Sequence, residues 1–421
     1  MKEVKHIKLG RNNNIFFKKS KKFKTIGISI DFKMKYDHKL VTAFHILSKY
    51  LGNCSNKYPS IELLNKYIDS LYGTSLGVKV DYTGSLFAFN VFANYINPKY
   101  VNDESLHEKV IEVLHDVIYD AYVKDGKLDE TIFNICKENC KIHLKGLKEY
   151  NMAYVIRTLR QNLCNDKYSS LVVPSVGEVS VINKLNNENI YNYYKKLFKA
   201  PFDIYVTGDF SFSKMEKLIR KYFAKKHTNS FKYSVFEPIE GKEIEPTIIK
   251  KEVSQAKVAV AYKIPVLFND DRHYAFRMAR LVLSGTLSSK FGKVIREKLG
   301  LCYSINSSYS SYYGVFLVTT GVASENIDKV VKEIDNQINE VKNGNVSDEE
   351  FLRAKEAILN DIISIDDSLF GTLNMIKTYN NFNQHFDLDV EYEKYNNVTK
   401  NDVIEVAKLL TYCSYVALDK E

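Results

Sequence analysis

The chain has 421 residues, of which 45% are hydrophobic, so it is long enough for two or three domains with their own cores. Its net charge of +9 is spread along the sequence and accompanies no nucleic-acid-binding motif, so we expect no nucleic-acid partner. The small basic excess remains compatible with a cavity for acidic substrates. Neither a run of about 18 apolar residues nor an apolar signal segment is present, and we expect no membrane contact. The six cysteines lack the spacing of a disulfide framework, which predicts a cytoplasmic protein without disulfides.

The first half of the chain begins with a strand, predicted from Thr25 by alternating apolar and polar residues. Two helical stretches, two strands and an amphipathic helix follow. In order, these six elements occupy residues 25–32, 38–51, 61–73, 76–84, 85–94 and 105–123. Further helices are predicted at residues 128–147 and 187–198.

The second half repeats this order of elements. The corresponding strand, two helices, two strands and helix are predicted at residues 257–264, 274–285, 288–300, 302–311, 314–323 and 325–344. In both halves the second helix ends at a glycine, Gly73 or Gly300, as expected for a left-handed residue after a helix. Helices also close the second half, and Asp348 and Thr399 are their predicted N-caps.

Two copies of one unit predict an α+β protein with two homologous domains, each a mainly antiparallel sheet packed with helices. The polar, proline-containing stretch 227–248 is the predicted linker. The domains would then be residues 1–226 and 249–421.

Specific residues give these copies a family resemblance. Arg296, Gly300 and Tyr303, followed by serine, form an Arg-x-x-x-Gly-x-x-Tyr-Ser phrase, and an earlier strand ends in Gly-Asp at 208–209. In these features the chain resembles the insulinase–pitrilysin–mitochondrial processing peptidase family of zinc peptidases, over most of residues 20–415. The resemblance implies a half-clamshell that needs a second half to enclose a substrate chamber. It also implies that Arg296 and Tyr303 bind the substrate peptide, whose backbone pairs with a strand edge.

Active members of that family hold zinc with a His-x-x-Glu-His motif on the first long helix. The two histidines share one helix face and bind the metal, and the glutamate takes a proton from the zinc-bound water. At the matching positions this chain has His45, Ser48 and Lys49. Serine cannot act as a carboxylate base, and an ammonium repels a dication. A later glutamate ligand aligns only loosely, near Cys136 or Glu138. We therefore predict a degenerate zinc site, no bound metal or other cofactor, and no catalytic residue.

A second set of residues also has metal-ligand chemistry. Cys136, Cys140 and His143 fall on one face of a predicted helix and could offer three soft ligands to zinc. The same spacing fits a buried stripe that includes Phe133 and Leu144. No fourth ligand is evident in the sequence, so we favour the buried stripe.

A lost metal motif beside a retained Arg–Tyr phrase predicts a division of labour between two chains. We expect a non-catalytic subunit of a heterodimeric zinc metallopeptidase, which uses Arg296 and Tyr303 to bind peptide for a zinc-bearing homologous partner. The alternative is an accessory or assembly module without peptidase activity, similar to zinc-less bacterial relatives linked to modification of a translation elongation factor. A metalloenzyme built on Cys136, Cys140 and His143 is a third hypothesis.

Overall fold

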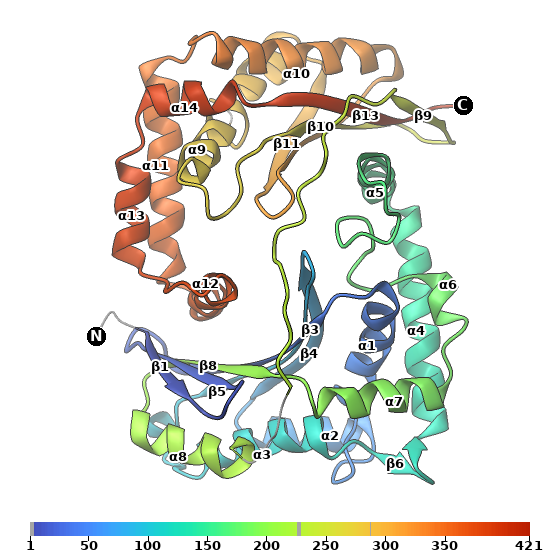
Figure 1. Cartoon of the computed structure of the whole chain (residues 1–421), viewed down its shortest axis with the longest axis vertical. Coiled ribbons are helices and arrows are strands. Elements are labelled where there is room, and N and C mark those ends of the chain that lie inside the picture. The colour runs from blue at the N-terminus through green and yellow to red at the C-terminus, as the bar shows by residue number, and fades with distance from the viewer. Residues whose placement is uncertain (1–3, 225–228, 287) are drawn as a thin grey trace. The chain divides into compact units, whose positions relative to one another are not determined.

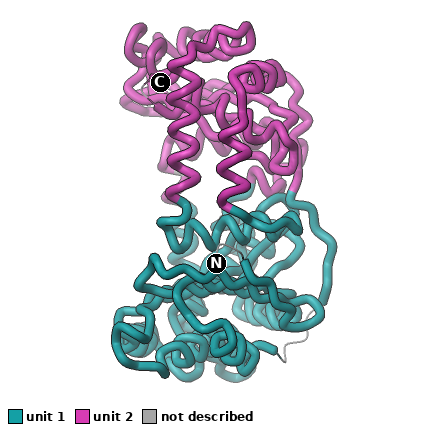
Figure 2. The backbone as a smooth tube through the Cα atoms, turned by 90° about the vertical axis from the view of Figure 1, so that its left-hand side faces the viewer, with its two compact units in different colours: residues 1–145, 173–235, 365–387 teal, residues 146–172, 236–364, 388–421 magenta. Residues whose placement is uncertain are grey.

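The computed structural model describes residues 4–224, 229–286 and 288–421, so positions 227 and 228 of the predicted linker lie outside the described residues. The chain forms two compact units, shown in different colours in Figure 2. Unit 1 comprises residues 1–145, 173–235 and 365–387, and unit 2 comprises residues 146–172, 236–364 and 388–421. The units thus differ from the sequence halves in two segments: 146–172 packs in unit 2, and 365–387 packs in unit 1.

Unit 1 is built on a six-stranded sheet with the strand order β1-β2-β8-β3-β5-β4. All neighbouring strands are antiparallel except β2 and β8. The strands are β1 (Lys5–Lys8), β2 (Asn14–Lys19), β3 (Thr25–Lys35), β4 (Ser75–Thr83), β5 (Leu86–Ile96) and β8 (Phe202–Gly208). The main helices are α1 (His38–Leu51), α2 (Ile61–Ser70), α3 (Leu106–Tyr119), α7 (Asn187–Leu197) and α8 (Phe212–Phe223), and most of α4 (Glu130–Glu149) also belongs here.

The strand β3 shows why this sheet is covered on both faces. Its apolar residues Ile26, Ile28, Ile30 and Phe32 are at most 1% exposed and belong to the hydrophobic core. Because successive side chains point to opposite faces, the intervening residues Gly27, Ser29, Asp31 and Lys33 form a polar second face. The helix α12 (Leu369–Asn381) packs on that face, and Figure 1 shows α3 and α8 on the opposite side of the sheet.

The approach of α12 depends on a glycine. A Cβ atom at Gly27 would lie only 2.2 Å from Leu369 Cδ2 and 3.2 Å from Leu373 Cδ1. The hydrogen atom of glycine therefore allows the apolar start of the helix to lie directly against the sheet.

Buried ion pairs hold the other end of α12. Lys377 Nζ lies 2.9 Å from Asp31 Oδ1 and Lys33 Nζ lies 2.6 Å from Asp203 Oδ2, with each of these four side chains at most 15% exposed. Asn380 Nδ2 also donates to Asp203 Oδ2 at 2.9 Å. Burial disfavours the charge on Lys33, but the Asp203 carboxylate and weaker neighbouring effects outweigh burial and raise the pKa of Lys33. The second face of this sheet is therefore closed largely by charge pairing.

Unit 2 is built on a five-stranded sheet with the order β11-β12-β10-β13-β9. All neighbours are antiparallel except β13 and β9. The strands are β9 (Thr247–Lys250), β10 (Ala256–Lys263), β11 (Cys302–Ser310), β12 (Val315–Val322) and β13 (Thr411–Asp419). The main helices are α5 (Asn151–Leu163), α9 (His273–Leu283), η2 (Phe291–Lys298), α10 (Ile327–Lys342), α11 (Asp348–Ile365), α13 (Leu388–Asn396) and α14 (Lys400–Ala407).

In unit 2 the covering helix is α5, and its contact with the sheet is apolar. Val155, Leu159 and Leu163 of α5 belong to one buried cluster. Their partners from the sheet include Ala259, Ala261, Val315, Leu317 and Val416. The predicted α+β class with mainly antiparallel sheets is confirmed for both units.

The repeated order of elements is also confirmed. It reads β3-α1-α2-β4-β5-α3 in unit 1 and β10-α9-η2-β11-β12-α10 in unit 2. Gly73 and Gly300 have φ angles of +70° and +62°, the left-handed conformation that was predicted. One element differs between the copies, because η2 is a π-helix where α2 is an α-helix.

The helix caps in the second half agree with the sequence in one case and differ in the other. Thr399 caps α14 and forms a capping box with Asp402. The prediction of Asp348 as an N-cap is wrong by one residue, because Ser347 Oγ accepts the backbone N–H of Glu350 at 3.1 Å and the Glu350 carboxylate accepts the N–H of Ser347 at 3.0 Å. A serine three residues before a glutamate forms this reciprocal pair, which an aspartate at 348 would not.

Of the helices in the described residues, none combines the length and apolarity needed to cross a membrane.

The two left-handed glycines can be tested by substitution. At both positions a Cβ atom would meet nothing within 4 Å, so Gly73→Ala and Gly300→Ala should destabilise the fold only through backbone strain, by about 1 kcal/mol each. The helical Gly146 is equally open, and Gly146→Ala should stabilise by up to about 1 kcal/mol. Urea unfolding measures all three changes, and the same sign for all three would contradict this assignment.

The buried pair under α12 makes a second prediction. Lys377→Met removes the cation that pairs with the buried Asp31 carboxylate and should lower the free energy of unfolding by about 3 kcal/mol. The matched control is Lys22→Met, because Lys22 is 53% exposed and pairs with Asp366 and Asp367 just before α12. Its loss should change stability by less than about 1 kcal/mol. Equal effects in denaturant unfolding would show that burial of the Lys377 pair is unimportant.

Candidate functional site

The first predicted site lies on α1, whose start is fixed by the side chain of Asp37, which accepts the N–H groups of Lys39 and Leu40. His45 is on the buried side of this helix at 7% exposure, and Nε2 has no hydrogen-bond partner among the described residues. Its ring centroid lies 6.2 Å from that of His143 on α4. Burial, with smaller effects from the charge of Lys49 and from His143, lowers the pKa of His45 to about 4. The imidazole is therefore neutral at pH 7.

The other two positions of the motif, Ser48 and Lys49, offer no free group that could bind a metal ion. Ser48 Oγ donates to the carbonyl oxygen of His45 at 2.7 Å, so the hydroxyl is used within its own helix. Lys49 is exposed, and its positive charge acts on His45 and on the thiols of Cys136 and Cys140. The structure thus brings His45, Ser48 and Lys49 together with α4, but it places a cation where a metal ligand would be needed.

The cysteines of α4 belong to the core. Phe133, Cys136, Cys140 and Leu144 are each at most 4% exposed and form the predicted buried stripe. Burial raises the pKa of Cys136 to about 11 and that of Cys140 to about 12, so both stay protonated thiols at neutral pH. Metal ligation requires the thiolate.

A zinc ion, which the sequence resemblance implies for active family members, does not fit these residues. His45 retains one neutral nitrogen, but its neighbours on α1 are a hydroxyl already bonded to the backbone and an ammonium. Within the described parts of the chain, no three His, Cys, Asp or Glu side chains form a group that could hold a metal ion. Structural zinc sites use four protein ligands and catalytic sites use three.

The second predicted site lies in unit 2, where the π-helix η2 leads through Gly300 into β11. Arg296 from η2 places its guanidinium carbon 5.3 Å from the centre of the Tyr303 ring, within range for a cation–π contact. Tyr303 is 82% exposed, so its hydroxyl is available to a ligand. The register of β11 on β12 shifts between Cys302 and Ile305, which places Tyr303 in an irregular part of the strand.

The strand that carries Tyr303 is at the edge of the sheet. Among the strands in the described part of the chain, β11 pairs with β12 alone, so its other side offers backbone N–H and C=O groups to a further strand. Edge strands that carry such groups bind extended peptides by adding a strand to the sheet.

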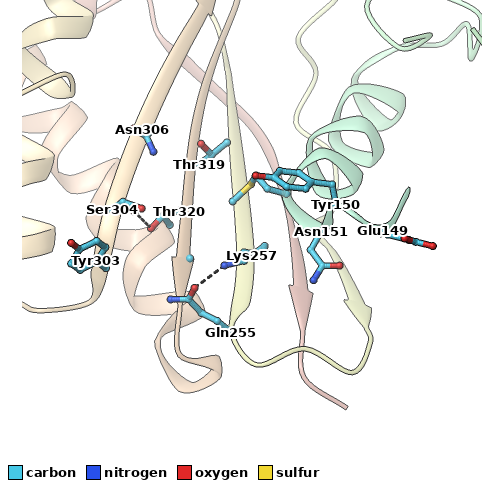
Figure 3. A pocket seen from close by; sticks show the side chains of 12 residues that line it. Glu149, Tyr150, Asn151, Gln255, Lys257, Tyr303, Ser304, Asn306, Thr319 and Thr320 are labelled. Atoms are coloured by element: carbon cyan, nitrogen blue, oxygen red, sulfur yellow. Dashed lines mark hydrogen bonds between the residues drawn. The ribbon is translucent and has the colours of Figure 1, made fainter. Parts of the chain in front are cut away.

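An open pocket of about 500 Å³ lies beside this edge. Figure 3 shows its side chains, which come from the end of α4 and the start of α5, from β11 and β12, and from β10 and the residue just before it. The residues that line it are Glu149, Tyr150, Asn151, Met152, Gln255, Lys257, Tyr303, Ser304, Asn306, Thr319, Thr320 and Gly321. Only Tyr303 and Ser304 of this set stand out in the sequence. The other lining residues come from distant segments and share no motif. Their membership of the pocket could have been suspected only from the alternation of apolar and polar residues along β10 and β12.

Residues 184–358 match the model of the family described as "Peptidase M16 inactive domain". The chain is also 24% identical over 398 residues to the "Probable inactive metalloprotease YmfF" of Bacillus subtilis, which covers 93% of this chain and 92% of that protein. The chain is thus similar to M16 peptidases, which supports the resemblance seen in its sequence. Its similarity to a relative described as inactive accords with the absence of a complete zinc motif.

Solved structures with low sequence identity share the fold of this chain. A conserved protein from Enterococcus faecalis has a TM-score of 0.91 at 24% identity and covers 100% of this chain and 99% of its own. The periplasmic protease PqqL from Escherichia coli has a TM-score of 0.75 at 13% identity, covering 100% of this chain but 46% of its own. This chain therefore has about half the length of that protease.

The low pKa of His45 predicts a pH dependence of stability. The ring takes up a proton near pH 6.5 when unfolded but only near pH 4 when folded, so the unfolded state binds more protons in between and stability falls as the pH drops through this range. His45→Leu removes this contribution, and the loss of stability between pH 7.5 and pH 5 should shrink by about 2 kcal/mol.

Urea unfolding at the two pH values measures this difference. His385→Leu is the matched control, because His385 is exposed and its replacement should leave the pH dependence as in the wild type. An unchanged pH dependence in His45→Leu would contradict burial of a neutral imidazole.

Proposed function

We propose that this chain is the non-catalytic subunit of a heterodimeric zinc metallopeptidase and that it binds peptide for a zinc-bearing M16 partner. The observation that carries the proposal is the contrast between its two sites. In α1, Ser48 stands where zinc-bearing relatives have the general base, and Lys49 stands where they have the second histidine ligand. The unit 2 site keeps the Arg296–Tyr303 contact beside the open edge of β11.

The unit 2 site has the groups that peptide binding requires. A peptide paired with β11 gains backbone hydrogen bonds irrespective of its sequence. The guanidinium of Arg296 is a donor only, and the hydroxyl of Tyr303 can donate to a carbonyl oxygen. Among the described residues Arg296 makes no ion pair, so its donors remain available to a ligand.

The length of the chain supports the proposal that it works together with a second chain. It covers 46% of PqqL, so a second chain of similar size would bring the total to that of the longer protein. A partner with an intact His-x-x-Glu-His motif would supply the zinc that His45, Ser48 and Lys49 do not hold.

Reconstitution tests the proposal. The chain is co-expressed with a homologue from the same genome that carries His-x-x-Glu-His, and complex size and peptide cleavage are measured. Arg296→Ala should lower kcat/KM about ten-fold, which is about 1.4 kcal/mol of transition-state stabilisation, and Tyr303→Phe should lower it less.

The controls are chemically matched substitutions away from the site. Arg353→Ala removes an arginine that is 56% exposed on α11 and paired with Glu349, and Tyr72→Phe removes the hydroxyl of a tyrosine that is 49% exposed. Both should leave cleavage unchanged. Full activity of the Arg296 and Tyr303 variants would refute the assigned site. A stable chain that forms no complex would instead favour an accessory module without peptidase activity.

A further inference from the structure

The pocket beside β11 continues a sheet face whose chemistry changes along its length. Beneath α5 this face is aliphatic, with Ala259 and Ala261 of β10 beside Leu317 of β12. Two residues further along β10 the same face carries Lys257, which pairs across the sheet with Gly321. The uncovered end of the face therefore has a cation where the covered part has alanine.

The ammonium of Lys257 has a neutral partner only. Its Nζ donates to Gln255 Oε1 at 2.7 Å, and it takes part in no ion pair within the described residues. Lys257 is partly buried, so its charge is incompletely solvated, and a carboxylate would be a stronger partner than the amide. Figure 3 shows that the only carboxylate lining the pocket, Glu149, points away from Lys257.

Aromatic side chains stand at both ends of the pocket. Tyr150 and Tyr303 are 71% and 82% exposed, and Figure 3 shows Lys257 and Gln255 between them. Arg296 lies over the Tyr303 ring, so a second cation stands at that end. The pocket thus combines aromatic surface with uncompensated positive charge, which disfavours a basic side chain.

At Gly321 the strand β12 places no side chain of its own between β11 and Lys257. A Cβ atom there would lie 2.6 Å from Gln255 Oε1 and 2.9 Å from Lys257 Nζ, so this amide and this ammonium both lie over the glycine. A strand added to β11 would be three strand spacings, about 14 Å, from β10. An extended lysine and an extended glutamate together span this distance along the sheet face, whereas aspartate is one methylene shorter.

We propose that the pocket lined by Lys257, Tyr303 and Tyr150 selects peptides with an acidic side chain, glutamate above all, next to the residue that pairs at Tyr303. This inference rests on the proposed peptide binding at β11 and adds a substrate class to it. The carboxylate would replace Gln255 as the partner of Lys257 and lie close to Arg296.

Fluorescence anisotropy with the full chain tests the proposal. The probes are three labelled nonapeptides of alternating valine and threonine that differ only at the central residue, which is glutamate, glutamine or lysine. The glutamate peptide should bind about ten-fold more tightly than the glutamine peptide, as expected for a charge-assisted hydrogen bond, and the lysine peptide should bind most weakly. In Lys257→Met the preference for glutamate over glutamine should fall below about two-fold.

The control substitution is Lys329→Met, which removes an exposed lysine on α10 and should preserve the preference for glutamate. Equal, measurable binding of all three peptides would overturn acidic selection and leave peptide binding intact. A preference that persists in Lys257→Met would overturn the role of this lysine. If none of the peptides binds, the peptide-binding function fails together with the pocket.

Discussion

A β-sheet has two faces, and the repeated unit of this chain supplies enough helices for only one of them. The second face of each sheet is covered by a helix from the other half of the sequence: α12 in unit 1 and α5 in unit 2. The two solutions differ chemically, because α5 buries aliphatic side chains whereas α12 brings Lys377 and Asn380 to buried carboxylates. A polar cover of this kind specifies one position of the helix, since a shift along the sheet would leave charges unpaired.

The two candidate sites lie on copies of the same repeated unit, but they differ from each other in chemistry and in helix type. In unit 1 the helix that would carry the metal is intact and well capped, and His45 still faces α4. The change is confined to the chemistry at Ser48 and Lys49, so the fold needs neither the metal nor its ligands. In unit 2 the second helix of the repeat, η2, is the counterpart of α2. It is a π-helix, a form that is frequent at functional sites, and it places Arg296 over Tyr303.

The sequence predicts those features that depend on local pattern. Alternation reveals β3, and glycine placement reveals the left-handed residues at 73 and 300. The degenerate motif is read directly from His45, Ser48 and Lys49. Local pattern does not predict which element covers the polar face of β3. In the sequence Asp31 resembles a solvated residue, because its partner Lys377 lies in a remote segment. The pocket is hidden for the same reason, since Tyr150, Lys257 and Thr319 meet only after the sheet has formed.

The late position of α12 in the chain affects how the protein is made. Asp31 and Lys33 leave the ribosome more than 300 residues before the segment 365–387, which completes unit 1. At roughly 5–20 residues per second, the polar face of the first sheet waits on the order of ten seconds or more for its cover. Unit 1 therefore cannot finish folding before residues 365–387 have been synthesised, and the polar face of its sheet stays uncovered until then.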